Sequence, residues 1–180
     1  MVDQVQGDPD QVNDAGIMMT PVIPGACSGI IRYNTLRNCH NGIALADALG
    51  SNVKVYRNII VDTQADPDPD RAGDIRVRGA ADGVEIYHNT LINGLGHGIT
   101  LQAVGAARVP TNCIVKNNIV YGNGGVALQV EPDVVTYGTG NVMDYNDYYK
   151  ASGNVFTWGA SSYTAAQFAA YKTASGQDAH

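Results

Sequence analysis

The chain has 180 residues, of which 44% are hydrophobic and 16% charged, and its formal net charge is −6. This length suits one domain with a sizeable core, and the apolar content excludes an intrinsically disordered chain. With 11 Lys and Arg against 17 Asp and Glu, the chain lacks the basic surplus that binding to nucleic acid requires. No apolar run approaches the roughly 18 residues of a membrane span, so we expect neither nucleic acid nor membrane as a partner.

Residues 1–13 are expected to form a polar, acidic leader without the basic and apolar regions of a secretory signal. The protein would be extracellular or periplasmic if a signal has been removed, and cytoplasmic otherwise. The three cysteines form no C-x-x-C motif, which argues against a cysteine metal site. Cys113 lies in an apolar strand pattern and is expected to be a small buried hydrophobe.

Residues 14–158 repeat a unit of about 25–30 residues. Each unit opens with an alternating apolar and polar strand that ends at an asparagine, and a second short apolar strand follows. A turn rich in Asn, Gly and Asp then leads to a third strand, at 42–45, 74–77, 98–101 and 125–128, with an isolated third strand at 16–19. The recurring asparagines are Asn34, Asn58, Asn89, Asn118 and Asn146.

Three short strands cannot enclose a core, but stacked copies can, because each strand then pairs in parallel with its equivalent about 4.8 Å away. The asparagines suit tight bends with left-handed backbone angles, and their amides can bond to one another from rung to rung. The sequence therefore predicts an all-β fold, a parallel β-helix of about five rungs. Residues 162–176 are expected to form a short closing helix, with a capping box between Thr164 and Gln167 and a stop at Gly176.

The pattern Gly-Ile-x-Leu, a variable loop, and Val-x-Ile-x-x-Asn-x-Ile resembles the right-handed parallel β-helix repeat of the pectate-lyase-like superfamily, from residue 16 to about 150. The tail from Tyr163 to Asp178 resembles the short C-terminal helix that closes many bacterial members. The resemblance implies a right-handed coil that interacts with carbohydrate, above all acidic polysaccharide. It is less specific for function, because the same architecture hosts lyases, hydrolases, epimerases, phage adhesins and modules without known activity.

In members that cleave polysaccharides, the cleft runs along the outer face of the third-strand sheet. Arg76 and Arg78 are predicted on this face, where two neighbouring charges of one sign do not stabilise a sheet. They would grip carboxylate or hydroxyl groups of a sugar, one of them acting as a base, or they would pair with the acidic loop before them. The remaining outward positions are small or neutral, and the candidates among them for substrate binding are Thr100, Gln102 and Gln129.

Gly96-His97-Gly98 is similar to the Gly-His-Gly stretch of polygalacturonase-type glycoside hydrolases. The resemblance implies a role in catalysis for His97 alone. Asp74 is the one residue placed to stand in for an acid, whereas inverting hydrolysis needs two carboxyl groups. His40 lies in the equivalent turn of the first rung and would line the same rim, or be a lone exposed imidazole. The Asn-Thr-Asp, Asp-Asp and Arg-Ile-Lys stretches of these hydrolases are absent. So are the Trp-Ile-Asp-His and Arg-x-Pro-x-x-Arg signatures of pectate lyases.

The loop before Asp74 contains Asp66, Asp68 and Asp70, which alternate with prolines. Their carboxylates are hard oxygen ligands of the kind that Ca²⁺ prefers, and many uronate-cleaving lyases use this cation. The loop lacks the common calcium-binding signature, and a solvated turn is the other interpretation of the same residues. Calcium is therefore a candidate cofactor.

Two tyrosines, Tyr56 and Tyr87, occupy equivalent outward positions on adjacent rungs and are expected to stack. Such a pair serves as a sugar platform or as a cross-strand stabiliser. His88, directly before a recurring asparagine, is expected to be a structural corner residue.

The chain enters the coil in mid-rung, and an uncovered first rung would expose strand edges and the apolar residues Ile17, Ile30 and Ile31. The leader could cover this end, or the chain could be part of something longer. Our hypothesis is an end-to-end homodimer through the N-terminal rung. Three interpretations remain open: a lyase or hydrolase that uses Arg76, Arg78, His97 and Asp74, a non-catalytic β-helix that binds glycan or protein, or a truncated gene product without activity of its own.

Overall fold

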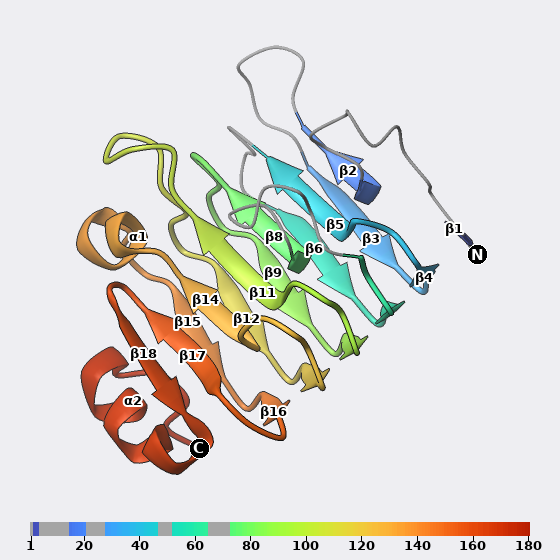
Figure 1. The fold of residues 1–180 in the computed structure, drawn as a ribbon. Helices are drawn as coiled ribbons and strands as arrows, with labels where there is room; N and C mark the ends of the chain where they lie inside the picture. Colours follow the sequence, from blue (N-terminus) through green and yellow to red (C-terminus); the bar gives the residue numbers. More distant parts are fainter. Residues whose placement is uncertain (1, 4–14, 21–27, 47–51, 65–72) are drawn as a thin grey trace.

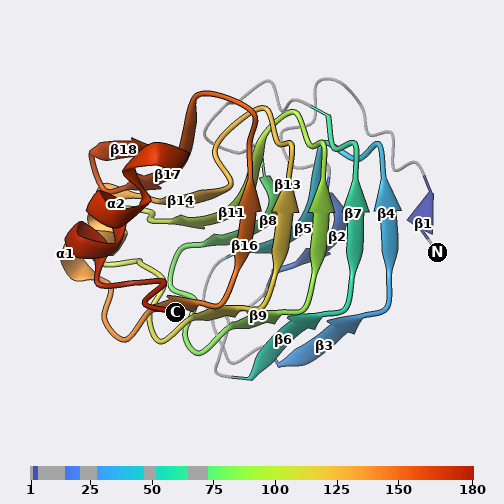
Figure 2. The same ribbon diagram turned by 90° about the horizontal axis from the view of Figure 1, so that it is seen from below.

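The computed structural model describes residues 2–3, 15–20, 28–46, 52–64 and 73–180. They form three sheets that run along one coil, so that the chain visits each sheet once per turn (Figures 1 and 2). The all-β parallel coil predicted from the repeat is confirmed. Among the described strands every pairing is parallel except that of the last two strands of sheet B.

Sheet A contains the second strand of each turn: β1 (Val2–Asp3), β4 (Thr35–Arg37), β7 (Ile59–Val61), β10 (Thr90–Ile92), β13 (Ile119–Tyr121) and β16 (Asp147–Tyr149). Sheet B contains the third: β2 (Ala15–Met19), β5 (Asn41–Ala46), β8 (Gly73–Arg78), β11 (His97–Gln102), β14 (Leu128–Val130), β17 (Asn154–Trp158) and β18 (Ser161–Thr164). Sheet C contains the first: β3 (Gly29–Arg32), β6 (Val53–Tyr56), β9 (Glu85–Tyr87), β12 (Ile114–Lys116) and β15 (Val142–Asp144).

The coil makes about four turns, slightly fewer than the about five rungs predicted. The five recurring asparagines enclose four intervals, and the strands before and after them belong to incomplete turns. At the N-terminal end, sheets A and B each have one strand more than sheet C. Strand β1 pairs with β4, for example Val2 with Leu36, and β2 pairs with β5, for example Ile17 with Ile43. Most of the predicted leader lies outside the described residues, so the end-to-end dimer stays a prediction.

The core is a column of apolar side chains in each sheet. In sheet B, for example, Ile43, Ile75, Ile99 and Leu128 are paired in register and fully buried. Each such side chain contributes roughly 1.5–3 kcal/mol through burial, which makes this apolar column the main stabilising feature of the stacked turns.

The predicted asparagine ladder is confirmed between sheets C and A. The side-chain amide of Asn34 donates to Oδ1 of Asn58 at 3.0 Å, and the next three steps measure 3.0, 3.0 and 2.9 Å. Each Oδ1 also accepts the backbone N–H of the preceding ladder residue. Repetition thus supplies partners for amides that are almost fully buried in the middle of the ladder.

At the bend between sheets C and A, the residue with left-handed backbone angles is not the asparagine, as predicted, but its neighbour. Positive φ angles occur one position before each ladder asparagine, and the asparagines themselves are not among the positive-φ residues. At the first four bends, Nδ2 of the asparagine donates to the carbonyl of the residue two positions earlier, and the residue between them makes the bend. The five bend residues, with φ between 54° and 56°, are Tyr33, Arg57, His88, Asn117 and Tyr145.

The C-terminal segment begins as a strand rather than as the helix predicted from residue 162. A turn at Gly159, with φ of 61°, reverses the chain, and β18 pairs antiparallel with β17. A 3-10 turn (Ala165–Gln167) and α2 (Phe168–Ser175) follow, while a short helix, α1 (Pro132–Tyr137), comes directly after β14. The predicted capping box of Thr164 with Gln167 is present, and Gly176 ends α2 in a left-handed conformation.

Candidate functional site

Register brings several predicted site residues together on the outer face of sheet B. Arg76 is aligned with Thr100, which in turn is aligned with Gln129, and Arg78 is aligned with Gln102. However, the exposed fractions are only 2% for Arg76, 0% for Thr100 and 3% for Gln102, whereas Arg78 and Gln129 are partly exposed. The expected array exists, but its centre is shielded from solvent instead of forming an open cleft.

Asp74 does not lie on this face. Its carboxylate is fully buried and accepts hydrogen bonds from Oγ1 of Thr63 at 2.5 Å and from Nδ2 of Asn123 at 2.8 Å. Burial is the main cause that raises the pKa of Asp74 to about 7, against the lowering effect of the two hydrogen bonds. A carboxyl group enclosed in this way cannot protonate a ligand on the surface, so its predicted role as an acid in the cleft is not supported by its position.

His97 bridges two turns of the coil. Its Nδ1 accepts the backbone N–H of Val126 at 2.9 Å, and Oδ1 of Asn41 accepts the N–H of Gly73 at 3.2 Å in the same way. His97 on β11 and Asn41 on β5 both lie beside Gly73 on β8, the strand between them. Asn41 directly follows His40 in the sequence. The equivalent of His97 is therefore Asn41 rather than His40, and the interaction of His97 is one that a structural residue makes.

The candidate calcium ligands Asp66, Asp68 and Asp70 lie outside the described residues. Within the described ranges, no group of three or more His, Cys, Asp or Glu side chains could hold a metal ion. Cys39 and Cys113 are both fully buried. Burial raises the pKa of the Cys113 thiol to about 12, which fits the predicted small hydrophobe and not a nucleophile.

A second group of side chains, which we call the tyrosine–arginine surface, consists of Arg32, Tyr33, Tyr56, Arg57 and Tyr87. The rings of Tyr56 and Tyr87 stack at 4.9 Å with 7° between their planes, which confirms the predicted pair. The guanidinium of Arg32 donates to the hydroxyl of Tyr56 at 3.0 Å, and that of Arg57 donates to the hydroxyl of Tyr33 at 2.6 Å. Both guanidiniums also lie over the ring of Tyr33.

This surface is open to solvent and positively charged on an acidic protein. Tyr33 is 61% exposed, and both arginines are exposed. The hydrogen bond to Tyr33 raises the pKa of the Arg57 guanidinium above its usual value, so the group carries its charge at every accessible pH. Sequence analysis found the tyrosine pair but missed the arginines, because their contacts depend on bends that bring Tyr33 and Arg57 of consecutive turns together.

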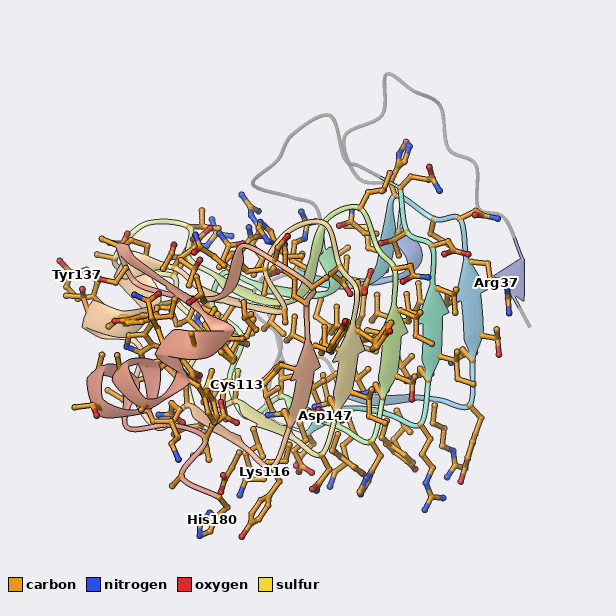
Figure 3. All side chains as sticks on the ribbon, turned by 60° about the horizontal axis from the view of Figure 1, so that its bottom comes forward. Arg37, Cys113, Lys116, Tyr137, Asp147 and His180 are labelled. Carbon is orange, nitrogen blue, oxygen red and sulfur yellow. The ribbon has the colours of Figure 1, made fainter. Side chains whose placement is uncertain are left out.

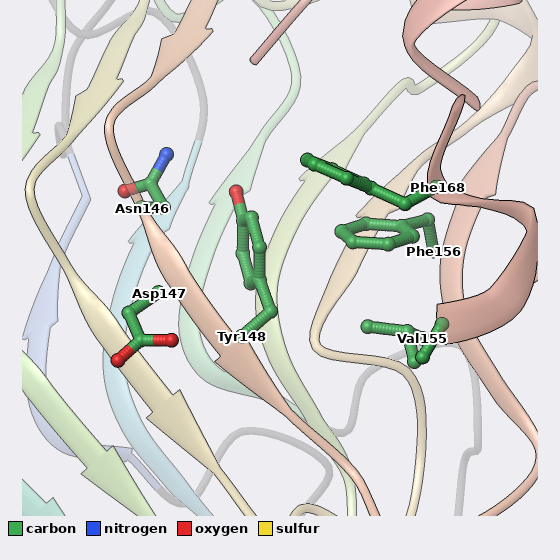
Figure 4. Close-up of a pocket in the computed structure, with 7 residues that line it drawn as sticks. Asn146, Asp147, Tyr148, Val155, Phe156 and Phe168 are labelled. Carbon is green, nitrogen blue, oxygen red and sulfur yellow. The ribbon is translucent and has the colours of Figure 1, made fainter. Parts of the chain in front are cut away.

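A cavity of about 260 Å³ lies where the last turn meets the C-terminal segment (Figure 4). Rings of Tyr148, Phe156 and Phe168 line it, together with the polar residues Asn146 and Asp147. Burial raises the pKa of Tyr148 well above its usual value, so its hydroxyl is no nucleophile. We assign no chemistry to this cavity.

A family model described as a right-handed β-helix region matches residues 22–168. The chain belongs to the right-handed β-helix family. Membership establishes the hand of the coil and agrees with the resemblance to pectate-lyase-like proteins. No curated protein and no solved structure matches the chain significantly. For this β-helix protein, the described helices include none long and apolar enough to cross a membrane.

Proposed function

We propose that this right-handed β-helix protein binds an acidic polysaccharide at the tyrosine–arginine surface and does not cleave it. The observation that carries the proposal is the pair of exposed, permanently charged guanidiniums held beside three tyrosine rings. A planar guanidinium matches the two oxygens of a uronate carboxylate, and an amphipathic tyrosine contacts both the apolar and the hydroxyl-bearing parts of a sugar.

The backbone at the bends gives independent support. Tyr33 and Arg57 both adopt φ angles near 55°, a region that is unfavourable for large side chains and suits Asn or Gly. Asn117 occupies the equivalent bend two turns after Arg57. Strained positions that keep large side chains occur preferentially where those side chains have a function.

The positions of two of the predicted catalytic groups support the proposed absence of cleavage. Asp74 is enclosed in the interior, and Nδ1 of His97 is engaged with the backbone of the next turn. A glycosidase needs two carboxyl groups beside its substrate, and a lyase needs a base at the carbon next to the uronate carboxylate. Asp74 thus cannot serve as one of these carboxyl groups, and of the two arginines predicted as a base, Arg76 is almost fully buried while Arg78 is partly exposed.

The test is binding of polygalacturonate and of neutral dextran to the full chain, measured by calorimetry at low and high salt. We expect binding to polygalacturonate alone, weakened by salt because charge pairs at an exposed surface are screened. The variant Arg57→Asn removes the guanidinium and leaves a residue that suits the bend, so it should fold normally and raise the Kd by at least about tenfold. Lys172→Gln, on α2, is the matched control and should leave the Kd unchanged.

Three outcomes would contradict the proposal. If Arg78→Gln weakens binding and Arg57→Asn does not, the ligand lies on sheet B, as predicted from the sequence. If ultraviolet absorbance reveals unsaturated sugars, or new reducing ends form, the protein is an enzyme. Absence of binding to any acidic polysaccharide would also overturn it.

A further inference from the structure

One row of side chains on sheet C continues the tyrosine–arginine surface toward the C-terminal end of the coil. The row consists of the last residue of each strand of this sheet, and the strand pairing places these residues side by side in the order Arg32, Tyr56, Tyr87, Lys116 and Asp144. A cation thus lies on either side of the two stacked tyrosines. With strands about 4.8 Å apart, three steps separate Arg32 from Lys116, which is roughly 14 Å.

The ammonium group of Lys116 is available to a ligand. Its side chain is partly exposed, and it forms no ion pair with any residue that the structure describes. Lys54, on the neighbouring row of the same sheet, is instead paired with Glu85 at 3.0 Å. A cation without such a partner adds to the attraction that the two arginines exert on an anionic ligand.

The row also has a defined end. Asp144, its last member, carries a carboxylate that pairs with Nδ1 of His180 at 3.1 Å, and the ring of His180 stacks on Tyr145. Lys116 and His180 lie at the same edge of the coil (Figure 3). A carboxylate held at this place repels an anionic chain, since like charges that face each other are unfavourable. The part of the row that attracts anions therefore runs from Arg32 to Lys116 and ends there.

We infer that the acidic polysaccharide lies along the coil axis on this row, with one carboxylate at the two arginines and a second at Lys116, an inference that rests on the proposed function. The ligand is then a chain of uronates and not a single uronate, because only a chain presents two carboxylates about 14 Å apart. The sugars between them cross Tyr56 and Tyr87, whose amphipathic rings contact both hydroxyl groups and apolar carbons.

Two contacts on one chain reinforce each other. Once the first carboxylate is bound, the second binds as an intramolecular step at a high effective concentration, so affinity rises when the chain is long enough to reach Lys116. A chain laid across the strands of sheet C would instead leave the arginines after one turn. It would then meet Lys54 and Glu85, whose charges already compensate each other.

The experiment measures the Kd of galacturonate oligomers of two and six units for the full chain by calorimetry. The hexamer should bind the wild-type chain more tightly than the dimer, since it alone reaches both cations. Lys116→Gln should raise the Kd of the hexamer about threefold to fivefold, as expected for the loss of one exposed ion pair, and should not weaken the dimer further. Lys116→Arg keeps the charge and should bind the hexamer like the wild-type chain. Lys172→Gln makes the same change of charge on α2 and is the matched control.

The outcomes separate this inference from the proposed function. If Arg57→Asn weakens hexamer binding and Lys116→Gln does not, the polysaccharide binds at the tyrosine–arginine surface without running along the row, and the inference is overturned. An equal loss for dimer and hexamer in Lys116→Gln would also overturn it. If neither oligomer binds, or if Arg57→Asn has no effect, the proposed function itself fails. Circular dichroism of each variant verifies that the substitutions preserve the fold.

Discussion

At the scale of single residues, the bends between sheets C and A hold four large side chains at positive φ, and one asparagine. Residues with a Cβ are disfavoured in this region because Cβ crowds the backbone, and the short polar side chains of Asn and Asp tolerate it best. The hydrogen bond of Arg57 to Tyr33 offsets part of that cost at the first two bends. His88 lacks such a bond and is exposed, with one edge-on contact to Tyr87.

We therefore expect His88→Asn to raise the free energy of unfolding by about 0.5–1 kcal/mol, since it relieves backbone strain and removes little packing. The reciprocal change, Asn117→His, should lower it by a similar amount. Urea unfolding followed by circular dichroism measures both. If both changes had the same sign, the side-chain contacts and not the bend would set the stability.

Asp74 predicts a pH dependence of stability. Its pKa is about 7 in the folded protein and near 3.8 in the unfolded chain, because burial disfavours the charged form. Between these values the folded state binds more protons than the unfolded state, so stability is fully present below about pH 4 and falls as pH rises toward 7. The decrease is at most about 4 kcal/mol. Asp178, whose pKa burial also raises, contributes in the same direction.

The variant Asp74→Asn should abolish most of this slope, because a neutral amide of the same shape does not titrate. Urea unfolding between about pH 4 and pH 8 gives the comparison. Asp133→Asn, on helix α1, serves as the control and should keep the slope of the wild-type protein. An unchanged slope in Asp74→Asn would mean that the carboxylate stays charged in the folded state.

At the scale of structural elements, the ladder makes each middle asparagine more important than the end ones. Oδ1 of Asn89 accepts two hydrogen bonds from Asn58, and its Nδ2 donates to Asn118 and to the carbonyl of Val55. Asn89→Ala leaves several buried groups without partners and should cost about 2–4 kcal/mol of unfolding free energy. Asn34→Ala, at the partly exposed end, should cost less than about 1 kcal/mol. Equal losses in urea unfolding would contradict the ladder's role.

The strands and the ladder could be predicted because their periods are local: alternation within a strand and an asparagine at each turn fix which side chains point inward. Asp74 shows where this fails. Alternation from the buried Ile75 predicts an outward Asp74, but the equivalent positions are Gly42 and Gly98, where an added Cβ would lie within 2.6 Å of core side chains. The side chain of Asp74 is likewise fully buried, in contact with Thr63 and Asn123.

The rest of the candidate site depends on contacts between turns that no single repeat contains. The row Arg76, Thr100 and Gln129 follows from register and was predicted, whereas the burial of its first two members depends on the complete fold. The contact of Arg57 with Tyr33 likewise requires that two bend residues of consecutive turns lie side by side. The spacing of residues along the sequence reveals neither this burial nor this contact between turns.

At the scale of the whole molecule, the last turn is closed by the end of the chain. The N–H of Met143 donates to Oε1 of Gln177 at 2.7 Å, and the N–H of Asp178 donates to the carbonyl of Met143 at 2.8 Å. The hydroxyl of Tyr171 donates to Oδ2 of the buried Asp178 at 3.0 Å, and burial raises the pKa of that carboxyl against the lowering effect of this hydrogen bond. The N–H of Asp178 thus reaches the carbonyl of Met143, which lies in register with Val115, the carbonyl that Nδ2 of Asn146 contacts one turn earlier.

Deletion of residues 177–180 should therefore lower the free energy of unfolding by about 2–4 kcal/mol, because it removes these bonds and orphans the buried hydroxyl of Tyr171. It would also leave the edge of β15 without its cover, so light scattering should detect aggregation at concentrations where the complete chain stays dispersed. His180→Ala is the matched control: its exposed ring stacks on Tyr145 and pairs with Asp144 at 3.1 Å, and the loss of these surface contacts should cost less than about 1 kcal/mol. If the deletion unfolds in urea like the control, the chain end does not close the coil.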